Sequence, residues 1–147
     1  MVDEGAFRQE LQATVALACP FGKAILARCC ACELAQQRAI ADRETVHCAQ
    51  QAQREQCHAL HGWLQRNSMF ALRRIDPAQP LTHAQHMKIQ CGGLHGLQRE
   101  FDEAEEVRDV AALVAAACQR FGSLEQWPSA RIVQAIAAFR LRQPHDK

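Results

Sequence analysis

Cysteines are the residues of this chain whose type and spacing most clearly indicate chemistry. Five of the eight fall within residues 29–57, as Cys29, Cys30, Cys32, Cys48 and Cys57. Soft thiolate sulfur selects iron–sulfur clusters, zinc and copper(I). Because disulfides are rare in a reducing cytoplasm, cysteines gathered this densely indicate a metal site rather than a disulfide framework.

Four thiolates are the usual ligand set of an iron–sulfur cluster. In an unbroken helix Cys29 and Cys32 would share one face and Cys30 would point away, whereas a break in the helix would let Cys30 chelate instead. The sequence leaves this choice open. It predicts an iron–sulfur cluster, with 4Fe–4S favoured and 2Fe–2S as the alternative type. The candidate ligands are Cys29 or Cys30, Cys32, Cys48 and Cys57.

The spacing of the last two candidates sets a condition on the fold. Nine residues of continuous helix would separate Cys48 from Cys57 by roughly 13–14 Å and place them on opposite faces. The two thiolates could not then share one site. A cluster therefore requires the chain to leave helical geometry near residues 49–51, where the apolar periodicity is weak.

Zinc is the nearest alternative, since tetrahedral zinc also takes four Cys or mixed Cys and His ligands. The first close cysteine pair of a zinc motif is present, but no second pair follows it. A mixed zinc site remains open with the ligands Cys29, Cys32, Cys57 and His61. Further alternatives are a copper(I)-binding bundle and a set of scattered buried thiols. Polar neighbours such as Arg28 and Glu33 disfavour full burial of these cysteines.

The other three cysteines have simpler interpretations. Cys118 follows three alanines and is expected to be a small buried hydrophobic residue. Cys19 precedes Pro20, as the last ligand of bacterial ferredoxins precedes a proline, but the pair fits a helix stop equally well. Cys91 precedes Gly92, and a glycine helix terminator followed by a loop is the favoured interpretation.

Histidines form two pairs with i, i+3 spacing, His58 with His61 and His83 with His86. Each pair could face one metal from a helix. Neither has the glutamate of a metalloprotease motif, so exposed surface histidines are expected. His47 stands beside Cys48 and could be a ligand or donate a hydrogen bond to a cluster sulfur.

Composition narrows the function classes. The 147-residue chain has a formal net charge of +1 and 22% charged residues, so no nucleic-acid surface is expected. No long apolar run suggests a signal peptide or a membrane span, which predicts a cytoplasmic protein. Phosphate-binding and nucleophile motifs of common enzymes are absent, so we expect no enzyme. The expected role is one-electron transfer or redox sensing with a redox partner protein.

Helix-forming composition, without Tyr and with few Val and Thr, disfavours strands. Apolar spacing and breakers predict helices near residues 3–18, 23–40, 52–72, 82–90, 97–121 and 127–139. We therefore predict a single all-α domain over residues 1–147, a bundle of five or six helices with a cysteine-lined metal site between the second and third. Residues 1–75 would form the metal-binding half, residues 81–140 the helical remainder and residues 141–147 a flexible tail.

Overall fold

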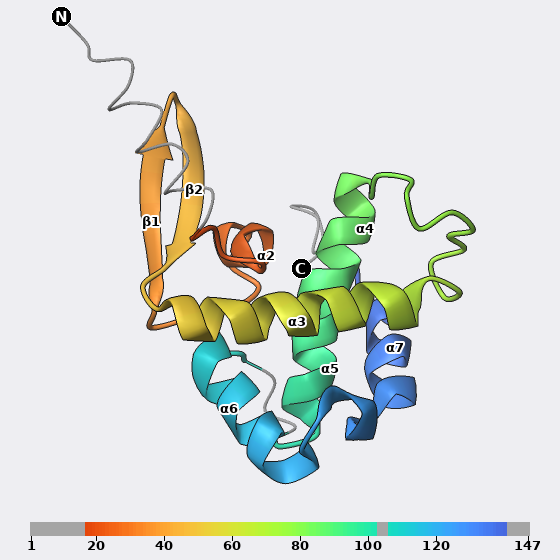
Figure 1. The fold of residues 1–147 in the computed structure, drawn as a ribbon. Helices are drawn as coiled ribbons and strands as arrows, with labels where there is room; N and C mark the ends of the chain where they lie inside the picture. Colours follow the sequence, from red (N-terminus) through yellow and green to blue (C-terminus); the bar gives the residue numbers. More distant parts are fainter. Residues whose placement is uncertain (1–16, 103–105, 141–147) are drawn as a thin grey trace, which may run out of the picture.

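The computed structural model describes residues 17–102 and 106–140, a helical body with a β-hairpin at its side (Figure 1). In chain order the elements are α2 (Gly22–Leu26), β1 (Ala35–Ile40), β2 (Arg43–Cys48), α3 (Gln51–Ser68), α4 (His83–Met87), the π-helix η1 (Lys88–Gly92), α5 (Gly93–Arg99), α6 (Val110–Phe121), the 3-10 helix η2 (Leu124–Gln126) and α7 (Ser129–Ala138). The helix predicted near residues 3–18 lies almost wholly outside the described residues.

The prediction of an all-α fold is wrong, because β1 and β2 form an antiparallel hairpin. Their register aligns Ala35 with Cys48 at the open end. Ala41 and Asp42, the two residues between the strands, have φ angles of 49° and 65°. Two successive positive φ angles are typical of a type I′ turn, whose twist matches that of the paired strands. Residues 43–48, which lie between the helices predicted near 23–40 and 52–72, therefore form a strand.

The second predicted helix, near residues 23–40, is also wrong. α2 ends at Leu26, and Arg28 follows with a φ of 62°, a left-handed conformation that an α-helix cannot contain. Within the described residues no helix lies between α2 and α3 to flank the predicted metal site, so its placement between helices 2 and 3 is corrected. Among the described residues, no three Cys, His, Asp or Glu side chains are grouped so that they could hold a metal ion.

One further helix boundary follows its local signal, and two others do not. Thr82 caps α4 as predicted: its hydroxyl accepts from the Gln85 N–H at 3.1 Å, and the Gln85 side chain accepts from the Thr82 N–H at 3.0 Å. The helix predicted to end at Cys91 instead continues through η1 and α5 to Arg99. The helix predicted at residues 97–121 is interrupted, since α6 begins only at Val110.

Two glycines explain why the helix continues past Cys91. A Cβ atom at Gly92 would lie 2.8 Å from the Cα of Ile136, and one at Gly96 would lie 2.7 Å from the Cβ of Ala135. Both distances are shorter than van der Waals contact. The glycines therefore form the face on which α7 packs directly against the η1–α5 backbone, and they do not terminate the helix.

Replacement of Gly96 by Ala is expected to lower the free energy of unfolding by about 1–3 kcal/mol, because the new methyl group overpacks the contact with α7. Urea denaturation measures this change. Gly62→Ala is a matched control on α3, where the new Cβ would meet only the flexible end of Arg66 at 3.2 Å. There the higher helix propensity of Ala should leave stability unchanged or raise it. Equal destabilisation by both substitutions would contradict the packing argument.

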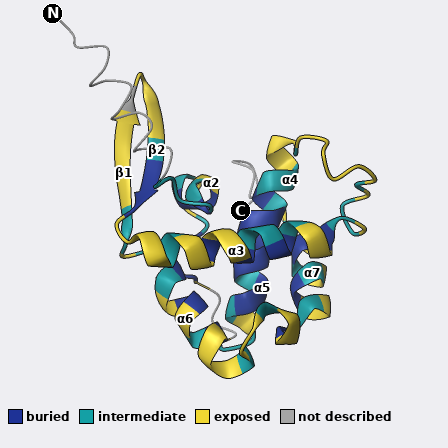
Figure 2. Cartoon of the chain, viewed as in Figure 1, coloured by how far each residue is buried: buried dark blue, intermediate teal, exposed yellow. Residues whose placement is uncertain are grey.

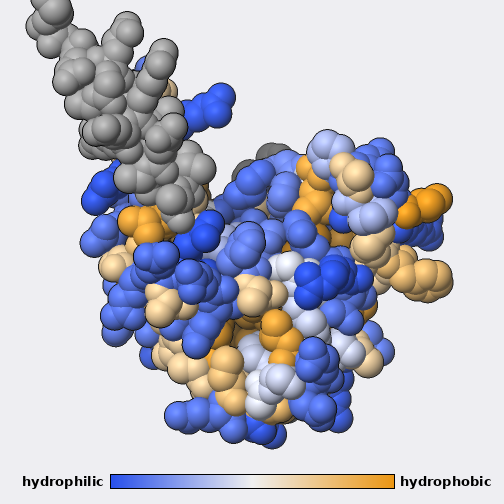
Figure 3. All heavy atoms as spheres, in the orientation of Figure 1, coloured by the Kyte–Doolittle hydropathy of each residue, from blue (hydrophilic) through white to orange (hydrophobic). Residues whose placement is uncertain are grey.

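The core lies where α3 passes the continuous α4–η1–α5 helix and α7 (Figure 2). Its fully buried side chains include Leu60 and Leu64 of α3 and Ile132 and Ile136 of α7. Figure 3 shows a mainly hydrophilic face with scattered hydrophobic patches. Within the described part of the chain, no helix is long and apolar enough to span a membrane.

Candidate functional site

Four cysteines from four separate segments converge at the open end of the hairpin, and we call them the four-thiol site. They are Cys19 before α2, Cys32 before β1, Cys48 at the end of β2 and Cys57 in α3. Figure 1 shows the hairpin standing beside the first turns of α3. Cys48 and Cys57 are buried, whereas Cys19 and Cys32 are partly exposed.

Backbone pairing fixes the position of Cys19 next to β2. Its N–H donates to the carbonyl of Val46 at 2.9 Å, and the N–H of Cys48 donates to the carbonyl of Leu17 at 2.9 Å. Ala18 forms an antiparallel bridge with the residue between them, His47. The segment that ends at Pro20 therefore lies along β2 as a short third strand would.

Cys32 and Cys57 are tied to the same place by neighbouring hydrogen bonds. The N–H of Ala35 donates to the carbonyl of Cys32 at 3.1 Å, and Ala35 pairs with Cys48 across the hairpin. On α3, Arg54 Nε donates to the carbonyl of Ala18 at 3.1 Å. Since Arg54 and Cys57 are i, i+3 neighbours, the helix presents Cys57 on the face that meets this segment.

Electrostatic interactions between the sulfurs show how close the four side chains are. Burial raises the pKa of Cys19 to about 11, and the nearby Cys32 and Cys48 contribute to this shift. Burial likewise raises the pKa of Cys57 to about 12, with contributions from Cys19, Cys32 and Cys48. The four groups therefore interact as one set, and without a metal these two thiols stay protonated at neutral pH.

N–H donors are directed at the sulfurs of three of these cysteines. The backbone N–H of Phe21 donates to Cys19. The backbone N–H groups of Leu34 and Ala111 donate to Cys32. The side-chain amide of Gln53 donates to Cys57 Sγ at 3.4 Å. Such bonds favour the thiolate form, and they partly offset the cost of burying negative charge.

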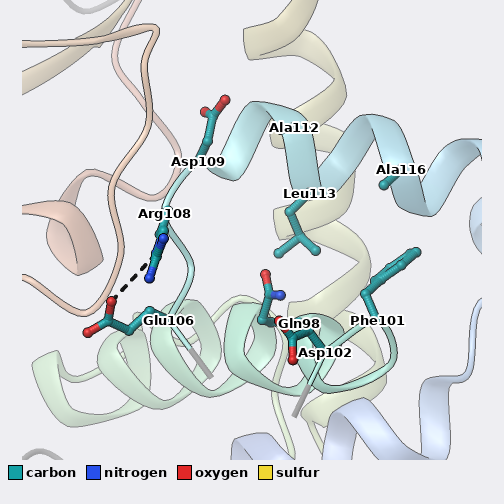
Figure 4. A pocket seen from close by; sticks show the side chains of 9 residues that line it. All are labelled: Gln98, Phe101, Asp102, Glu106, Arg108, Asp109, Ala112, Leu113 and Ala116. Carbon is teal, nitrogen blue, oxygen red and sulfur yellow. Dashed lines mark ion pairs between the residues drawn. The ribbon is translucent and has the colours of Figure 1, made fainter. Parts of the chain in front are cut away.

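The N-terminus of α6 forms the outer side of the site next to Cys32. Ala111 lies in the first turn of this helix, where free N–H groups favour negative charge. Asp109 precedes the helix, accepts from the Glu33 N–H at 3.1 Å and also hydrogen-bonds Cys32, which favours the thiol form of that residue. Figure 4 shows Asp109 at the start of α6, beside a pocket of about 440 Å³.

The condition placed on Cys48 and Cys57 is met by the fold. β2 ends at Cys48, Gln50 is extended with φ −127° and ψ 123°, and α3 begins at Gln51. The chain thus leaves helical geometry where the two thiolates need it to. Whether they act as ligands stays a prediction.

The adjacent pair Cys29 and Cys30 lies to one side of the four-thiol site. Cys30 is buried, its pKa is raised to about 12 by burial, and its main thiol neighbour is Cys29, followed by Cys19 and Cys32. Cys29 instead contacts Cys91 of η1.

Sequence reasoning undervalued Cys19, and the signal that could have found it was the Cys19-Pro20 pair.

The solvent exposure of Cys118 and of the paired histidines tests two further expectations. The prediction that Cys118 is buried is wrong, because its side chain is exposed on α6. His58 and His83 are exposed as expected, whereas His61 and His86 are largely covered. The ring of His61 packs edge-on against Phe21, with centroids 5.8 Å apart. Its charge interactions are with His86 and His58, not with the cysteines.

His47 of β2 is buried, and its backbone pairs with Ala18 in the segment before α2. Its Nε2 lies 3.2 Å from the hydroxyl of Thr45. Burial and the nearby Arg38 lower the pKa of His47. At neutral pH it is therefore an uncharged neighbour of Cys48, able to orient that part of the strand through its hydroxyl contact.

Comparison of the chain with models of protein families, with curated proteins and with solved structures gave no match. The function of the four-thiol site therefore has to be inferred from its own residues.

Proposed function

We propose that the chain is an iron–sulfur protein whose cluster is held by the four-thiol site, through Cys19, Cys32, Cys48 and Cys57. The cluster would be of the 4Fe–4S type and would serve one-electron transfer or redox sensing. The observation that carries the proposal is the convergence of four cysteines from four segments, with N–H donors directed at three of the sulfurs. Hydrogen bonds to sulfur are among the features that set the potential of such clusters.

The spread of the sulfurs bears on the kind of metal site. A mononuclear zinc ion needs four donors that converge on one point. In a 4Fe–4S cluster each thiolate binds a different iron, so the ligands stand further apart. Among the described residues no three potential ligands are grouped so that they could hold a single metal ion, so four interacting thiols from separate segments suit the larger group better. Zinc remains the second candidate because the same thiolates would bind it.

Burial of the site bears on its role. Cys48 and Cys57 lie on the protein side, and the partly exposed Cys19 and Cys32 lie towards solvent. A cluster held in this way would be covered on one side and reachable on the other, as exchange of electrons with a redox partner protein requires. Reduced thiols also need a reducing compartment, which is why we place the protein in the cytoplasm.

Metal analysis of protein purified without oxygen tests the proposal. We expect brown protein with about four iron and about four acid-labile sulfide per chain. Reduction with dithionite should bleach the visible absorbance and give the electron paramagnetic resonance signal of a reduced cluster. Colourless protein with one zinc per chain would replace the proposal by a zinc-stabilised module. Protein that takes up neither metal, even after reconstitution with iron and sulfide, would overturn both.

A further inference from the structure

A second pair of thiols, Cys29 and Cys91, lies beside the four-thiol site and is not used by it. The two side chains are joined by a hydrogen bond, and burial together with this bond raises the pKa of Cys91. Cys91 is fully buried, whereas Cys29 is partly exposed. Solvent can therefore reach the Cys29 thiol, and the Cys91 thiol lies behind it in the protein interior.

Unusual backbone geometry holds each member of this pair. Cys91 lies in the π-helix η1, and isolated π-helical turns occur frequently at functional sites. Cys29 follows Arg28, whose φ is 62°. Hydrogen bonds fix Cys29 between α2 and α5. The N–H of Cys29 donates to the carbonyl of Ala24 at 2.9 Å, and Nε2 of His95 lies 3.0 Å from the carbonyl oxygen of Cys29.

A pocket of about 470 Å³ opens at Cys29. Its charged lining residues are Arg28, Arg108 and Glu106, so it carries one excess positive charge. Arg108 Nε and Glu106 Oε2 are 3.7 Å apart, a pair drawn with a dashed line in Figure 4. Arg28 has no part in that pair and is exposed at the rim. The pocket is therefore suited to a small molecule that carries carboxylates.

We propose that Cys29 is a site of reversible thiolation by a small anionic disulfide of the oxidised-glutathione class, and that Cys91 is the resolving thiol. The inference rests on Cys29, Cys91 and the pocket at Cys29, and it holds whether or not the four-thiol site binds a cluster. Cys30, though adjacent in sequence, is buried, and its interaction with Cys91 is one of charge alone, whereas Cys29 also forms the hydrogen bond with Cys91.

The chemistry is thiol–disulfide exchange in two steps. The Cys29 thiolate attacks one sulfur of the disulfide RSSR, forms a mixed disulfide and releases one thiolate RS⁻. Cys91 then loses its proton and attacks the Cys29 sulfur, which closes the Cys29–Cys91 disulfide and releases the second RS⁻. Two protein thiols are oxidised, one RSSR is reduced, and the two protons leave on the two RSH molecules. Because burial raises the pKa of Cys91, the second step should be the slower one.

The test uses the full chain, purified without oxygen, in a Cys118→Ala background that removes the exposed cysteine. Oxidised glutathione is added, and samples are quenched with acid for peptide mass spectrometry. We expect one glutathionyl group on Cys29, followed by a Cys29–Cys91 disulfide. Cys29→Ser should take up no adduct at early times, and Cys91→Ala should stop at the mixed disulfide.

Each alternative outcome decides the proposal. An adduct that persists in the Cys29→Ser protein, or a first adduct on Cys30, would overturn the assignment of the nucleophile. A disulfide that joins Cys29 to a residue other than Cys91 would overturn the resolving role. If Cys91→Ala does not fold, Cys91→Ser tests the resolving role in its place. The early adduct on Cys29 in the parent protein still tests the nucleophile.

Arg28 provides a separate test of the anionic class. Arg28→Asn removes the charge and keeps a residue type that tolerates a positive φ. We expect the rate of modification by oxidised glutathione to fall by about two- to fivefold, because one exposed charge interaction is lost. The rate of modification by the cationic disulfide cystamine should not fall. An equal loss with both reagents would show that the pocket does not select charge.

Discussion

Replacement of Cys19 by Ala is expected to abolish cluster binding, whereas replacement of Cys30 by Ala leaves it intact. Cys19 lies in the four-thiol site, and its thiol interacts with Cys32 and Cys48. Loss of an outer hydrogen-bond partner typically costs about 10–100-fold in metal affinity, and loss of a ligand should cost at least that much. Iron retained after anaerobic desalting should therefore fall at least about tenfold in Cys19→Ala.

The two substitutions are matched in the side-chain atoms that they remove. Both remove one thiol, from a partly exposed position at Cys19 and from a buried one at Cys30. General destabilisation would therefore be at least as large in Cys30→Ala, and circular dichroism would detect it. Cys118→Ala on the surface of α6 serves as the neutral control. Iron lost from Cys30→Ala but kept by Cys19→Ala would restore the ligand set predicted from the sequence and refute the one proposed from the fold.

The hairpin was the part of the fold that local sequence rules missed. Residues 35–40 contain Ala, Gln and Arg, which favour helices, and only Thr45 and Val46 in β2 are β-branched. Propensity is a weak guide where tertiary contacts decide. The strand pairing here is set by the turn at Ala41 and Asp42 and by burial of the end of β2, and neither has a strong sequence signature.

Helices with a clear apolar face were predicted well, and those interrupted by glycine were not. α3 and α7 lie close to their predicted ranges. Gly92 was expected to end a helix because glycine often does so. Only the position of α7, which is distant in sequence, shows that Gly92 allows close packing instead.

The same reasoning explains the change of candidate ligands. Sequence spacing favoured Cys29, Cys30 and Cys32 because they are neighbours along the chain. Spatial proximity depends on the antiparallel bridge between Ala18 and His47, which brings Cys19 beside the end of β2. A contact across this many residues cannot be inferred from one sequence. Cysteine density therefore indicated the region, and the fold was needed to choose among its residues.

Acidification is expected to destabilise the protein through His61. Burial, with His86 and His58 nearby, lowers the pKa of His61 from 6.5 to about 4. Its Nε2 is covered and has no hydrogen-bond partner within the described part of the chain. A charged ring in this position would therefore carry a desolvated proton without an acceptor.

The sign of the effect follows from the direction of this shift. Between pH 6.5 and about 4 the unfolded chain binds a proton at His61 that the folded chain does not. The free energy of unfolding should therefore fall as the pH drops through this range and level off below it. At about 1.4 kcal/mol for each unit, the loss contributed by His61 is up to about 3 kcal/mol. His86, whose pKa is also lowered by burial, acts in the same direction.

Urea denaturation of the reduced, metal-free protein at several pH values measures this loss. His61→Phe keeps an aromatic ring against Phe21 and removes the titrating group, so its stability should depend much less on pH over the same range. His58→Gln changes an exposed histidine one turn away and should retain nearly the full dependence of the parent protein. If His61→Phe loses as much stability on acidification as the parent, the proton is taken up elsewhere, and His61 is not the group that burial holds neutral.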